Sequence, residues 1–115
     1  MSLDPRTPVL VGAAAVSQRF DDPHAGRSAI ALMTHACEEA AADAGNTDLL
    51  RAADVISVPT GTWTHPNAAG AIAQRLGNTT ARTVRAELGI LQTTLFRRAA
   101  DAIASGDIDV ALVVG

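Results

Sequence analysis

Short apolar runs alternate with alanine-rich helical patterns along the chain, and this alternation limits the folds that the chain can adopt. Runs rich in β-branched residues predict strands, and longer segments whose apolar residues recur every three or four positions predict helices. In chain order we predict a strand at 9–14, a helix at about 27–44, a strand at 55–58, a short helix at about 66–77, a strand at 82–86, a helix from 89 or 90 to 105 and a strand at 110–114. This order predicts an α/β fold whose sheet is mostly parallel, with helices on its faces and right-handed crossovers.

Continuous apolar runs, unlike alternating ones, are typical of strands that are covered on both faces. The residues at 9–14 form such a run and are predicted to be a buried strand, and the segments at 82–86 and 110–114 are also interpreted as buried strands. Glycines follow the predicted helices. Gly45 and Gly106 come after the two long helices and predict left-handed caps, and Gly77 ends the short helix.

Length and charge exclude several classes of protein. The 115 residues are enough for one domain with a hydrophobic core. A formal net charge of −3 lacks the basic surface that phosphate backbones require, and two phenylalanines with one tryptophan offer few platforms for stacking bases. Nucleic acid is therefore an unfavoured partner.

The sequence also carries no signal for export or for a membrane. The first residues lack a basic region followed by an apolar stretch, and no apolar run approaches the ~20 residues of a membrane span. The single cysteine, Cys37, cannot form an internal disulfide, which fits a reducing compartment. We therefore expect a cytoplasmic location.

Cys37 is a poor candidate nucleophile. A reactive thiol needs a helix amino terminus or a nearby cation to lower its pKa. Cys37 instead falls in mid-helix on an apolar stripe and is followed by Glu38 and Glu39, which would raise that pKa. We predict that it packs in the core.

The remaining polar residues form no recognised ligand set. His24, His35 and His65 lack metal-ligand spacing, so no metal site is expected. Gly12 belongs to no phosphate-binding glycine motif. Asp107 and Asp109 are assigned a structural role at the entry to the last strand, and Trp63 with His65 could line a pocket or pack in an interface.

The turn at Gly89 is the most suggestive local feature, because it joins the end of a predicted strand to the start of a helix. Such a turn presents free backbone N–H groups and the positive end of a helix dipole. It suits a nucleophile or an anionic or polar ligand group. By itself the signal is weak, since every helix of such a fold has an amino terminus.

Five motifs in a fixed order resemble the amino-terminal part of thiolase-superfamily proteins, across nearly the whole chain. They are VLVG at 9–12, ADAG at 42–45, ADVI at 53–56, AQRLG at 73–77 and AIASGDIDVALVVG at 102–115. The resemblance is greater to the divergent, acetyl-CoA acetyltransferase-like branch of actinobacterial type. It implies a three-layer, thiolase-like half-domain spanning 1–115, truncated before its fifth strand.

The resemblance also implies what chemistry to expect. Thiolases carry a nucleophilic cysteine at the start of the third helix, where this chain has Gly89, and 80–115 contains no cysteine. No catalytic residue is therefore assigned within the chain, and Gly89 and Ile90 are assigned to substrate binding. The implied ligand is a coenzyme A thioester, acted on in lipid metabolism, with no covalently bound cofactor. The family's histidines and second cysteine would come from later sequence.

Three alternatives stay open at this point. The chain could belong to a thiolase-like acyltransferase completed by further sequence or by a partner subunit. It could instead belong to a non-catalytic protein that binds acyl-CoA or lipid, or it could be a structural subunit that stabilises a partner. The apolar last strand, without a neighbour on its outer side, also predicts association into an oligomer.

Overall fold

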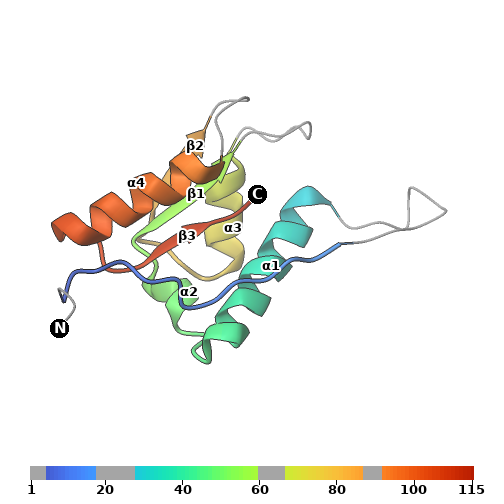
Figure 1. Cartoon of the computed structure of the whole chain (residues 1–115). Coiled ribbons are helices and arrows are strands. Elements are labelled where there is room, and N and C mark those ends of the chain that lie inside the picture. The colour runs from blue at the N-terminus through green and yellow to red at the C-terminus, as the bar shows by residue number, and fades with distance from the viewer. Residues whose placement is uncertain (1–4, 18–27, 60–66, 87–91) are drawn as a thin grey trace.

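A computed structural model describes residues 5–17, 28–59, 67–86 and 92–115 of the chain (Figure 1). Its elements are α1 (Ala29–Ala44), α2 (Leu49–Ala52), β1 (Val55–Pro59), α3 (Ala68–Arg75), β2 (Arg82–Ala86), α4 (Gln92–Ser105) and β3 (Ala111–Val113). The predicted α/β class is confirmed. Six of the seven predicted elements are present, within a few residues of the expected bounds.

The three strands form one parallel sheet in the order β2-β1-β3. Val55 of β1 pairs with Arg82 of β2 on one side and with Ala111 of β3 on the other. Because β1 is central, its residues from 55 to 58 are all buried, and Ile56 and Val58 have no exposed surface. The strand predicted at 55–58 is therefore confirmed as the buried centre of the sheet.

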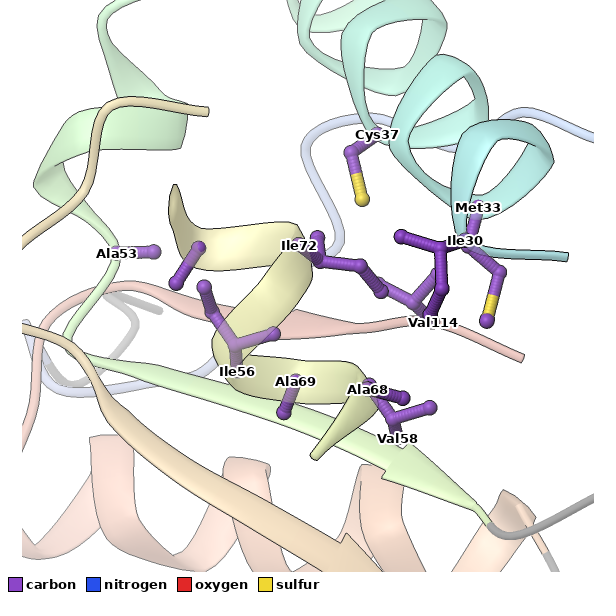
Figure 2. Close-up of a cluster of buried hydrophobic side chains, with 11 residues drawn as sticks. Ile30, Met33, Cys37, Ala53, Ile56, Val58, Ala68, Ala69, Ile72 and Val114 are labelled. Atoms are coloured by element: carbon purple, nitrogen blue, oxygen red, sulfur yellow. The ribbon is translucent and has the colours of Figure 1, made fainter. Parts of the chain in front are cut away.

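Helices cover both faces of the sheet, with α1 and α3 on one side and α4 on the other (Figure 1). Figure 2 shows side chains from α1, such as Ile30 and Cys37, gathered with Ile72 of α3 and Ile56 of β1. The small residues of α3, Ala68 and Ala69 among them, let this helix lie close to the sheet. The main hydrophobic core is therefore on the α1 and α3 side.

Helix ends follow the signals in the sequence. Ser28 caps α1, where its side-chain oxygen accepts a hydrogen bond of 3.2 Å from the Ala31 N–H. Gly45 ends α1 with a φ of 79°, as predicted. Asn67 caps α3 by accepting from Gly70 at 3.0 Å, whereas Pro66, expected in the first turn, lies outside the described residues.

The predicted strand at 9–14 is wrong. This segment is extended but belongs to no strand, and its apolar side chains at Val9, Leu10 and Val11 are 66%, 78% and 61% exposed. It is held against α1 instead: Gly12 lies so close to the Ala40 carbonyl oxygen that a Cβ would overlap it. The Ala13 N–H donates to the Asp43 carboxylate at 3.0 Å, so this backbone group is bonded to a side chain rather than to a neighbouring strand.

The other strands are less buried than predicted. Only Ala86 of β2 is buried, and all three residues of β3 are half-buried. Both strands lie at edges of the described sheet, so neither is flanked by strands on both sides as β1 is. Helix α2, which the sequence did not predict, is a single turn and therefore too short to show a helical period.

Asp54 joins the starts of all three strands. Its N–H donates to the Val110 carbonyl at 2.8 Å, and its carbonyl accepts from the Arg82 N–H at 2.9 Å. Its side-chain Oδ2 also accepts from the N–H groups of Asp109 and Val110, at 2.8 and 3.1 Å. These last two bonds hold the pKa of the Asp54 carboxyl below its ordinary value of 3.8.

The side chain of Asn78, like that of Asp54, bonds backbone groups of different segments, here in the connection from α3 to β2. Its amide nitrogen donates to the carbonyl oxygens of Leu50 and Ala53, both at 3.0 Å, and its Oδ1 accepts from Thr80 and Ala81 at 3.0 and 2.8 Å. Asn78 is almost fully buried; its bond to the Ala53 carbonyl is buried, and the other three bonds are part-buried. The network fixes the turn that returns the chain to the sheet.

We predict that Asn78→Ala lowers the free energy of unfolding by about 2–3 kcal/mol, because buried backbone groups lose their partners. Urea denaturation measures this change. Thr79→Ala is the matched control, since Thr79 is exposed, and should change stability by less than ~0.5 kcal/mol. Equal effects from the two variants would contradict the role of the network.

Asp54 predicts a pH-dependent contribution to stability. Because its folded-state pKa is lowered, the carboxylate stabilises the fold above its ordinary pKa, and this contribution is lost as pH falls below about 4. The Asp54→Asn variant keeps a side-chain oxygen that can accept a hydrogen bond, but it has no carboxylate to titrate. Its stability should therefore fall less as the pH is lowered, which urea midpoints between pH 7 and pH 2.5 measure. Since Asp54 is exposed, the effect at pH 7 should be only about 1 kcal/mol. An unchanged pH profile would refute the assignment.

Candidate functional site

The carboxyl ends of the three parallel strands lie at one edge of the sheet. β1 ends at Pro59, β2 at Ala86 and β3 at Val113. Because α3 follows β1 and α4 follows β2, the amino termini of both helices lie toward the same edge (Figure 1). In open α/β sheets, this edge is where ligands bind, since helix dipoles and free N–H groups converge there.

The predicted site residues follow the end of β2 in the sequence, but the structure does not describe them. Gly89 and Ile90 lie outside the described residues, as do Trp63, His65 and His24. The structure describes what flanks the turn: Ala86, buried at the end of β2, and Leu95, buried in the first turns of α4 with 2% exposure. The assignment of Gly89 and Ile90 to substrate binding therefore stays a prediction.

Cys37 is buried, as predicted. Its side chain is 2% exposed and lies within the core cluster, beside Met33 and Ile30 (Figure 2). Burial foremost, and the neighbouring charge of Glu38, raise the pKa of its thiol to about 12. A thiol with this pKa is protonated at neutral pH, so Cys37 cannot supply the missing nucleophile.

His35 and the described acidic residues form no metal centre. The His35 ring nitrogen Nε2 lies 3.7 Å from the Glu39 carboxylate, one helical turn along α1, and both side chains are exposed to solvent. Within residues 5–17, 28–59, 67–86 and 92–115, no group of three histidine, cysteine or acidic side chains could hold a metal ion.

Arg6 makes a long-range contact that the sequence did not reveal. Its guanidinium donates to the Ile103 carbonyl at the end of α4, at 2.6 and 3.0 Å, and to the Ile108 carbonyl at 2.7 Å. It also forms an ion pair with Asp109 at 2.8 Å. A cation is favourable at a helix carboxyl terminus. The contact supports the structural role predicted for Asp109.

An apolar groove, which we call the β3-edge groove, runs along the outer edge of β3. It encloses about 460 Å³ and is lined by residues of 8–14, by α1 and α4, and by 111–115. None of its lining side chains is charged, and the Cys37 thiol is the most polar of them. Phe96 of α4, 52% exposed, forms part of one wall. The shape of this groove could not be predicted from local sequence patterns, because its walls come from four separate segments.

The chain resembles solved structures of thiolase-fold proteins. It is similar to a monomeric SCP2-thiolase like protein type 1 from Mycobacterium smegmatis, with 29% identity over 97% of this chain and a TM-score of 0.73. It is also similar to 3-oxoacyl-(acyl carrier protein) synthase III of Xanthomonas oryzae (22% identity over 77% of this chain, TM-score 0.65) and to OleA of Xanthomonas campestris (21% over 76%, TM-score 0.64). No protein-family profile and no curated sequence matches the chain.

These likenesses show the class of fold. The described elements form a thiolase-like α/β unit, a parallel three-stranded sheet flanked by helices. The chain covers 23%, 27% and 26% of these three structures, so most of each lies outside the likeness. No described helix is long and apolar enough to cross a membrane.

We predict that Cys37 is unreactive in the folded chain, because it is buried and protonated. Iodoacetamide at pH 8 should leave the thiol unmodified for hours, whereas the chain in 6 M urea should be alkylated at the rate of a free cysteine. Intact-mass spectrometry measures both. Rapid alkylation without denaturant would show that the α1 and α3 core opens easily.

Proposed function

We propose that this chain is the amino-terminal portion of a thiolase-like, acetyl-CoA acetyltransferase-related protein that binds or acts on acyl-CoA in lipid metabolism. The observation that carries the proposal is the likeness over 97% of the chain to an SCP2-thiolase like protein. Other similar structures are a 3-oxoacyl-(acyl carrier protein) synthase III and an OleA variant with bound lauric acid and lauroyl-CoA. A coenzyme A thioester is therefore the ligand to test first.

The proposed ligand site is the turn at Gly89 and Ile90, between the end of β2 and the start of α4. A helix amino terminus there would direct backbone N–H groups and a partial positive charge at a carbonyl or phosphate oxygen. The described residues that flank it in the sequence, Ala86 at the end of β2 and Leu95 of α4, are both buried. The turn can thus orient a thioester without contributing a side chain.

The proposed chemistry does not pass through an acyl-cysteine of this chain. Glycine at position 89 has no nucleophilic side chain, and the Cys37 thiol is both buried and protonated. Turnover would need groups from a longer chain or a partner subunit, which fits the small share of each similar structure that this chain covers. Binding of the thioester requires none of them.

A non-catalytic protein that binds acyl-CoA or lipid is the second candidate. The β3-edge groove favours it, because about 460 Å³ lined by uncharged side chains suits an aliphatic chain better than a charged group. Both candidate functions predict that a ligand binds, but only the first allows turnover.

We predict that the full-length protein containing this chain binds acetyl-CoA, measured by isothermal titration calorimetry, and that Gly89→Trp weakens binding at least about tenfold, or 1.4 kcal/mol, by filling the turn. Gln74→Trp is the matched control, since Gln74 is exposed near the far end of α3 from the strand carboxyl ends. It should leave the affinity unchanged.

Hydrolysis or thiolysis of acetoacetyl-CoA, followed with and without iodoacetamide, separates the two candidates. If acyl-CoA binds but acetoacetyl-CoA is not turned over, the result supports the non-catalytic candidate. If turnover continues after treatment with iodoacetamide, the result supports chemistry that does not use a cysteine. Absence of any acyl-CoA binding would overturn the proposed function.

A further inference from the structure

We draw no further inference here: the strongest candidate, the apolar β3-edge groove between the segment 8–14 and the outer side of β3, carries none because nothing in the structure shows what covers it.

Discussion

The sheet depends on the hydrogen bonds of Asp54, which tie the starts of all three strands together. Its backbone links β1 to β2 through Arg82 and to β3 through Val110, and its carboxylate adds the bonds from Asp109 and Val110. Parallel strands are joined only through long crossovers, so their register needs such a point of attachment. From this end, β1 continues between both partners, and its buried residues meet the core formed by α1 and α3.

Fixing the amino ends of the strands also fixes where their carboxyl ends emerge. The hydrogen-bond network of Asn78 returns the chain from α3 to β2, and the pairing of β1 with β2 then continues to Ala86, where β2 ends. The role proposed for the residues that follow is to position a thioester rather than to react with it covalently.

Cys37 and Asp54 could be mistaken for reactive groups of a site, but they differ in how far they are buried. The α1 and α3 core keeps the thiol of Cys37 protonated, with a pKa of about 12, whereas the carboxylate of Asp54 is exposed and kept ionised by backbone N–H groups. Both shifts have structural causes, and neither group lies at the carboxyl edge of the strands.

Local patterns were enough to predict the α/β class, the cap at Gly45, the strand at 55–58 and the burial of Cys37, because each depends on neighbours within one or two helical turns. They failed for the run at 9–14, whose apolar residues predict a strand equally well whether or not a partner is available. How Arg6 reaches the end of α4 and how four segments form the β3-edge groove are set by contacts between residues distant in sequence. No period or spacing records such contacts, so the fold alone decided them.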